Sequence, residues 1–102
     1  MGESLLGEGS FKAAKGLIRV RVESKSSQIA NITISGDFFM HPEDSLWELE
    51  KKLRGTRTRR EEVLQKIREF CRTGNVLTPG VSPEDFAEAI ARALEASGDA
   101  SD

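Results

Sequence analysis

Hydrophobic and polar residues alternate with a period of two in the first third of the chain. In Leu17–Glu23 one side would hold Ile18, Val20 and Val22, and the other Arg19, Arg21 and Glu23. This pattern is typical of an antiparallel strand with one buried and one wet face. After a polar turn at Ser24–Ser27, a second strand over 28–35 would bury Ala30, Ile32 and Ile34. The two runs predict a β-hairpin.

The segment before this hairpin gives a weaker signal. A short first strand around Phe11 is compatible with residues 9–16, although the glycines there disfavour a regular strand. We expect residues 1–8 to be loose.

From Ser45 onward the apolar residues follow a helical period. Ser45 and Glu48 have capping-box spacing, and Gly55 marks the end of the first helix. The apolar face of this helix would be Leu46, Leu49 and Leu53.

Two more helices follow. The second would be capped by Thr58 and Glu61 and would end at Gly74, and the third would begin at Ser82-Pro83 and end at Gly98. Their apolar faces would be Val63, Leu64, Ile67, Phe70 and Cys71 in the second, and Phe86, Ile90, Ala93 and Leu94 in the third.

Strands followed by helices predict one α+β domain over residues 1–102, with a frayed tail at 99–102. A small antiparallel sheet of two to three strands would be covered on one face by about three helices. The net charge of −2 gives no global field for nucleic acid, and no apolar run is long enough to cross a membrane. One cysteine and no secretory signal pattern favour a cytosolic (cytoplasmic) setting.

Few residues offer catalytic or metal chemistry. His41 is the only histidine, and its place before Pro42 at a helix entrance favours a capping or surface role. We expect Cys71 to be a small buried hydrophobe, and no set of residues has metal-ligand spacing. Trp47 lies off the leucine line of the first helix, where it would be a core edge or an interface anchor. The chain alone is not expected to be an enzyme.

The turn Gly36-Asp37-Phe38-Phe39 has two interpretations. As a structural corner, it would bury one phenylalanine under the sheet, because two adjacent aromatic rings cannot face the same core. As a functional feature, the ring that points away would form an apolar patch for a partner.

A basic run covers residues 51–60, where six of ten residues are cationic. The simpler interpretation is a solvated helix end and loop. The alternative is that Arg57, Arg59 and Arg60 steer an anionic partner. Nucleic acid is not favoured, because no aromatic residue interleaves the basic ones.

These pieces together resemble the C-terminal accessory domain of lipoate–protein ligases over about residues 11–95. The resemblance is carried by Phe11-Lys12-Ala13, the strand 29–39 with its GDFF end, Leu49-Glu50 with Leu53-Arg54-Gly55, and Ser82-Pro83-Glu84-Asp85-Phe86. It implies a fold similar to that of iron–sulfur scaffold proteins. It also implies a non-catalytic activating subunit of a split ligase, whose complex uses ATP and lipoate to form lipoyl-adenylate although this subunit binds neither cofactor alone.

The partners implied are the catalytic subunit of the ligase and the lipoyl carrier domains. Lys12 is the candidate for a positive group near the adenylate, and Asp37, Phe38 and Phe39 are candidates for docking. A stand-alone adaptor, or a sulfur or iron–sulfur carrier that uses Cys71, remains the alternative.

Overall fold

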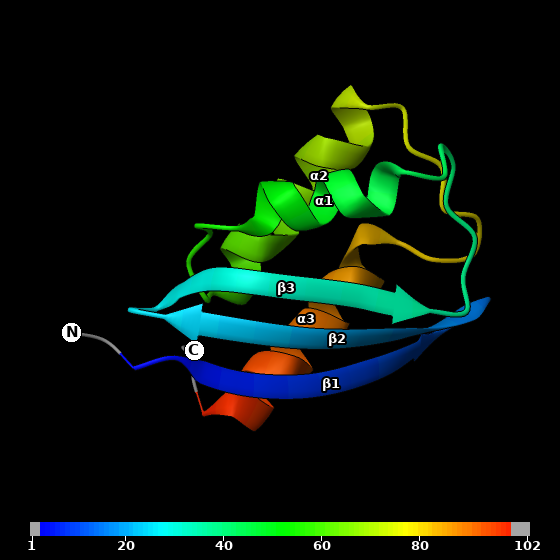
Figure 1. Ribbon diagram of the computed structural model, residues 1–102. Helices are drawn as coiled ribbons and strands as arrows, with labels where there is room; N and C mark the ends of the chain where they lie inside the picture. Colours follow the sequence, from blue (N-terminus) through cyan, green and yellow to red (C-terminus); the bar gives the residue numbers. More distant parts are fainter. Residues whose placement is uncertain (1–2, 99–102) are drawn as a thin grey trace.

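Three strands and three helices make up the computed structural model, which describes residues 3–98. In chain order they are β1 (Leu5–Ala13), β2 (Gly16–Lys25), β3 (Gln28–Gly36), α1 (Ser45–Leu53), α2 (Arg60–Thr73) and α3 (Pro83–Ser97). The strands form an antiparallel sheet in the order β1-β2-β3. Helix α3 crosses behind β1 and β2, while α1 and α2 lie beside β3 (Figure 1). The predicted α+β arrangement is confirmed, and the predicted tail at 99–102 lies outside the described residues.

Strand β1 is longer than the sequence predicts. Its pairing with β2 runs from Leu5 opposite Ser24 to Ala13 opposite Gly16, and so includes residues 5–8, which we expected to be loose. The glycines that disfavoured this strand allow α3 to lie directly on its backbone. A Cβ atom at Gly9 would come within 2.4 Å of the Ala93 nitrogen. The glycines serve a close contact with a helix far along the chain, and therefore do not interrupt the strand.

The buried positions of β3 differ from the prediction at one residue. Ile32 and Ile34 are buried as expected, but Ile29 is buried in place of Ala30. The register explains this, because Asn31 pairs with Glu23 whereas Ile29 pairs with the next residue of β2. Ala30 is the extra residue of a β-bulge, which shifts the side chains beyond it to the other face.

Helix α3 begins as predicted, with a complete capping box. The Ser82 hydroxyl accepts a hydrogen bond from the Asp85 N–H at 3.2 Å, and the Asp85 carboxylate accepts one from the Ser82 N–H at 2.9 Å. Gly98 ends the helix in the left-handed conformation, with φ of 87°. Glycine pays no Cβ penalty there.

The N-caps of the other two helices differ from the prediction by one residue. They are Asp44 for α1 and Arg59 for α2, and neither of these two side chains makes a capping hydrogen bond. The Thr58 hydroxyl donates to the Ser27 carbonyl at 3.4 Å, and the Thr58 N–H donates to the same oxygen at 3.1 Å. This residue ties the β2–β3 turn to the helical layer.

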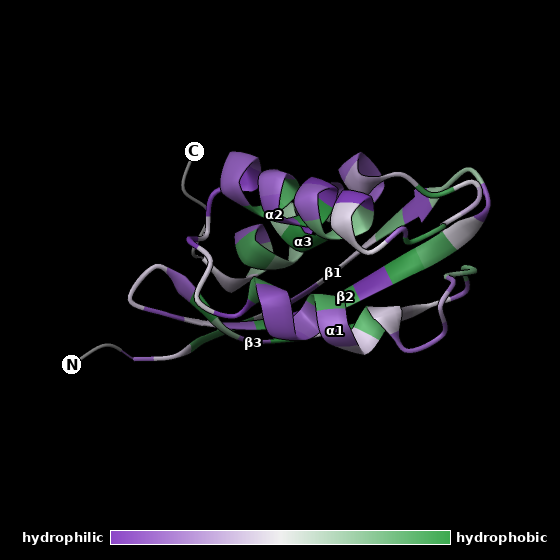
Figure 2. Ribbon diagram, turned by 90° about the horizontal axis from the view of Figure 1, so that it is seen from above, coloured by the Kyte–Doolittle hydropathy of each residue, from purple (hydrophilic) through white to green (hydrophobic). Residues whose placement is uncertain are grey.

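The core lies between the sheet and the helices. Its largest fully buried side chains include Ile18, Val22, Ile29, Leu49, Leu53, Val63, Ile67, Phe86 and Ile90. Hydrophobic and hydrophilic residues alternate visibly along β2 (Figure 2). Leu64, Phe70 and Cys71 pack only partly against the core, so the apolar face of α2 is narrower than predicted. No helix within residues 3–98 is long and apolar enough to cross a membrane.

Candidate functional site

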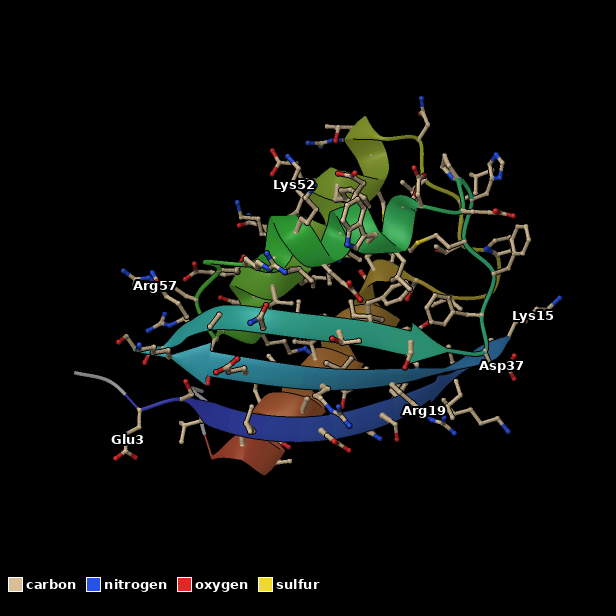
Figure 3. All side chains as sticks on the ribbon, viewed as in Figure 1. Glu3, Lys15, Arg19, Asp37, Lys52 and Arg57 are labelled. Atoms are coloured by element: carbon tan, nitrogen blue, oxygen red, sulfur yellow. The ribbon has the colours of Figure 1, made fainter. Side chains whose placement is uncertain are left out.

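The residues proposed for partner contact fall into two groups at opposite ends of β3. Arg57 forms a bridge with Gln28 at the start of the strand, whereas Asp37 directly follows the last residue, Gly36. Figure 3 shows Arg57 and Asp37 at opposite ends of the sheet. A strand of nine residues separates them, which is about 30 Å. One small contact therefore cannot include both groups.

The two phenylalanines of the turn point to different environments, as predicted. The ring of Phe38 packs edge-on against Phe86, with centroids 5.2 Å apart and an interplanar angle of 86°. Phe39 is 63% exposed. The Asp37 N–H donates to the Leu17 carbonyl at 2.9 Å, while the Asp37 side chain is exposed. Phe38 is thus partly buried against the core, and Phe39 lies on the surface.

A second loop lies beside this turn. The His41 N–H donates to the Leu77 carbonyl at 2.9 Å, and the Leu77 N–H donates back to the His41 carbonyl at 2.8 Å. Leu77 is 61% exposed. We call the surface formed by Phe39, His41 and Leu77 the docking end. Leu77 was missed in the sequence because it lies in a loop, where periodicity gives no signal.

The β1–β2 hairpin packs against the two loops that carry the docking end. The Lys15 N–H donates to the Gly80 carbonyl at 3.2 Å. A Cβ atom at Gly16 would come within 2.2 Å of the Asp37 carbonyl oxygen, so the hairpin lies directly against the GDFF turn. Backbone contacts between three segments hold these loops in place, so the exposed side chains rest on a supported surface.

Trp47 is an exposed residue rather than a core edge. It is 60% exposed, and the Lys51 ammonium lies 4.5 Å from the centroid of its ring. This cation–π contact lies on the outer surface of α1. The interface-anchor interpretation of Trp47 stays a prediction.

Lys12 lies on the face of the sheet opposite the helices. It pairs with Leu17 next to the β1–β2 hairpin, and its side chain is exposed. Its neighbours in β1, Phe11 and Ala13, face the core and are partly or fully buried. Lys12 is therefore near the docking end but on a different surface from Phe39.

The three arginines of the basic loop do not behave alike. Arg57 and Arg59 are exposed, but Arg60 forms an ion pair with Glu88 of α3. Glu88 also pairs with Arg92 at 3.0 Å. Hydrogen bonds from Arg60 and then from Arg92 hold the pKa of Glu88 below its ordinary value. The charge of Arg60 is used within the fold, so it is a poor candidate for a partner contact.

Cys71 is not the fully buried residue that we expected. It is partly exposed, and burial raises the pKa of its thiol. A raised thiol pKa lowers the fraction of reactive thiolate at neutral pH. His41 is exposed, and among residues 3–98 no cluster of three or more histidine, cysteine or acidic residues is placed to hold a metal ion.

Comparisons with known proteins agree with the resemblance found in the sequence. The family model described as the C-terminus of bacterial lipoate protein ligase matches residues 8–90. A relative from Thermoplasma acidophilum, lipoate-protein ligase A subunit 2, is 51% identical over 81 residues, which are 79% of this chain and 83% of the relative.

A solved structure from the same organism has a similar fold. It comes from a study of an archaeal lipoylation system, comprising a bi-partite lipoate protein ligase and its E2 lipoyl domain. The TM-score is 0.78 at 47% identity, and the match covers 88% of this chain and 97% of that one. The chain belongs to the family of lipoate–protein ligase C-terminal domains.

Proposed function

We propose that this protein is the non-catalytic activating subunit of a two-component lipoate–protein ligase. It would be required, with a separate catalytic subunit, for the ATP-dependent formation of lipoyl-adenylate. The strongest support is the 51% identical relative, which is itself a subunit of such a ligase and is covered over 83% of its length. Among the described residues no cluster of acids, histidine and cysteine is placed to hold a metal. An activating role fits a domain that exposes apolar side chains for contact with a partner.

Docking on the catalytic subunit would use Phe39 and Leu77. Both side chains are more than half exposed, and they come from two loops joined by backbone hydrogen bonds. A supported pair of apolar side chains loses little conformational freedom on binding, which favours affinity. Asp37 lies beside this surface and would contribute a polar contact at its rim.

Activation would follow from closure over the adenylate site of the catalytic subunit. Closure excludes water from the reactive mixed anhydride and orders the loops that hold the nucleotide. Lys12 is exposed near the docking end, so it would face the anionic reactants when the subunits meet. ATP and lipoate would be bound by the complex and not by this subunit alone.

Lipoyl carrier domains are a further partner class. The solved relative comes from a system that includes an E2 lipoyl domain. The exposed Arg57 and Arg59, at the opposite end from Phe39, would remain accessible to such a domain after docking. The alternative that this chain is itself a sulfur or iron–sulfur carrier gains no support from Cys71. A partly buried thiol with a raised pKa is a poor sulfur acceptor.

The direct test is adenylate formation by the catalytic subunit with and without this protein. We expect lipoyl-adenylate from ATP and lipoate only when both chains are present. The variant Phe39→Ala should weaken the complex about tenfold, as expected for an aromatic side chain that becomes buried when the subunits bind. The variant should retain the fold, because the ring is exposed in this chain alone. A matched control is Leu6→Ala, which removes an exposed apolar side chain of β1 outside the docking end. Equal adenylate formation by the catalytic subunit alone would reject the activating role.

A further inference from the structure

The face of the sheet opposite the helices carries, on its central strand, an arginine whose charge is not paired with a carboxylate of the described residues. Ser10, Arg19 and Ser35 form one row across the three strands, because Arg19 pairs with Ser10 on one side and with Ser35 on the other. In the next row Arg21 lies between Glu8 and Thr33. These two rows line a shallow hollow of about 530 Å³. Figure 3 shows Arg19 on this open face, with α3 behind the sheet.

The two arginines differ in their partners. Both Nε and Nη2 of Arg21 lie 3.0 Å from the Glu8 carboxylate, so the charge of Arg21 is balanced across the strands. Within residues 3–98 no carboxylate pairs with Arg19, whose cross-strand neighbours are two serines. Opposite charges facing each other are the usual stabilising arrangement on a sheet. The Arg19 row offers a guanidinium and two hydroxyls in place of an ion pair.

This set of groups suits a compact oxyanion. A guanidinium binds phosphate oxygens through two parallel hydrogen bonds, and serine hydroxyls can donate to the remaining oxygens. The short serine side chains also leave the space that forms the hollow. Lys12 pairs with Leu17 and therefore lies diagonally next to Arg19. Diagonal residues on neighbouring strands are about 7–8 Å apart along the sheet, so Lys12 would add a second positive charge near the row.

The surroundings favour a small anion over an acidic protein surface. A large acidic surface on this face would also meet the carboxylates of Glu8 and Glu23, which lie on the same side of the sheet. Like charges brought together at an interface are costly. A small anion needs only the Arg19 row. Glu8 also lines the hollow, but its carboxylate is paired with Arg21, and Glu23 lies outside the hollow.

We infer that the Ser10–Arg19–Ser35 row is a binding site for the phosphate groups of the nucleotide substrate or of the pyrophosphate that it releases. The inference rests on the proposed function for its biological ligand, but the site itself can be tested on this protein alone. The row binds phosphate oxygens and takes no part in bond making or breaking. This role requires that the open face of the sheet lies toward the nucleotide when the docking end binds the catalytic subunit.

The first experiment titrates the isolated protein with inorganic pyrophosphate and follows backbone amide shifts by NMR. We expect saturable shifts at residues 10, 19 and 35. Arg19→Ala should weaken binding about tenfold or more, because a charged, bidentate contact is lost. Arg19→Lys should be intermediate, since it keeps the charge and loses the planar fork. Lys25→Ala is the matched control, because it removes one positive charge from the same strand outside the hollow.

Two results of this titration would overturn the site. One is the absence of shifts at the row, or shifts of equal size in the Arg19→Ala variant. The other is an equal response to chloride at the same ionic strength, which would indicate nonspecific screening of charge. Binding of ATP with the same variant pattern would identify the intact nucleotide as a ligand.

A second experiment separates this inference from the proposed function. In the two-subunit reaction, Arg19→Ala should raise the KM for ATP about tenfold, while co-elution of the subunits and the KM for lipoate stay unchanged. An unchanged KM for ATP would reject the role of the site in the reaction. If the protein activated no ligase at all, the proposed function would fail, and the pyrophosphate titration would still decide whether the row binds phosphate.

Discussion

The two faces of the sheet are built from the same three strands but have different roles. One packs against the helices to form the core, and the other is polar and open to solvent. On the covered face, Gly9 lets α3 approach the strand backbone, and Phe86 is fully buried. On the open face Ser10 and Arg19 pair directly, and none of the three helices within residues 3–98 lies over them. Because side chains alternate along a strand, one sequence can specify a core and a binding surface independently. Changes to one face should alter stability, and changes to the other should alter interactions.

The largest expected effect is overpacking of the covered face. Gly9→Val would place a Cβ atom within 2.4 Å of the Ala93 nitrogen, so α3 must move away from β1. We expect a loss of about 3 kcal/mol in the free energy of unfolding, measured by urea denaturation. Ser10→Val, one residue further along the same strand, points to the open face and should change stability by about 0.5 kcal/mol or less. Similar losses in both variants would contradict the assignment of the two faces.

A second comparison uses the adjacent phenylalanines. Phe38→Ala should reduce the free energy of unfolding by about 2 kcal/mol, because it removes a partly buried ring that packs on Phe86. Phe39→Ala should leave stability nearly unchanged, since that ring is exposed. Thermal and urea unfolding of both variants, together with co-elution with the catalytic subunit, would separate the two roles. The reverse order of stabilities would show that the docking end is wrongly assigned.

Lys12→Ala is the corresponding test near the hairpin. The residue is exposed on the open face, so its loss should leave both the fold and subunit association intact. We expect the rate of adenylate formation to fall about threefold to tenfold, because a positive charge facing an anionic reactant is removed. Lys25→Ala again supplies the charge-matched control. An unaltered rate for Lys12→Ala would remove this residue from the proposed mechanism.

Local signals account for the parts of the fold that could be predicted. The alternation in β2 and the capping box of α3 each depend on residues close in sequence, and both are confirmed. The length of β1 could not be predicted, because Gly9 is explained only by its contact with Ala93. The bulge that exposes Ala30 likewise depends on the pairing of two strands.

The candidate surfaces divide in the same way. The exposure of one ring in the GDFF turn follows from local geometry, whereas the distance between this turn and Arg57 depends on the length of β3. The internal use of Arg60 depends on Glu88, a residue of another helix. Leu77 joins the docking end only through its backbone pairing with His41. Each of these facts requires contacts between segments that are distant in sequence.

The smallest expected effect concerns the charge network that ties the covered face together. Glu88 accepts hydrogen bonds from Arg60 and Arg92, and Arg92 in turn donates to the Ser10 carbonyl at 3.2 Å. Arg60 first, and then Arg92, lowers the pKa of Glu88 in the folded protein. The ordinary pKa of a glutamate, which applies in the unfolded chain, is about 4.3. The stabilisation is therefore fully present above that pH and is lost as the pH falls through the depressed pKa of Glu88 in the folded protein.

Removing the carboxylate should flatten this dependence. The side chains concerned are partly exposed, so solvent screening limits the contribution to a few tenths of a kcal/mol. Glu88→Gln should lose stability at pH 7 and converge with the unmodified protein as the pH falls through the depressed pKa of Glu88, as measured by urea unfolding at each pH. Arg60→Gln removes the main cause of the lowered pKa, and so should also reduce the slope. Parallel curves for all three proteins would show that the network adds nothing to the covered face, which would then depend on apolar packing alone.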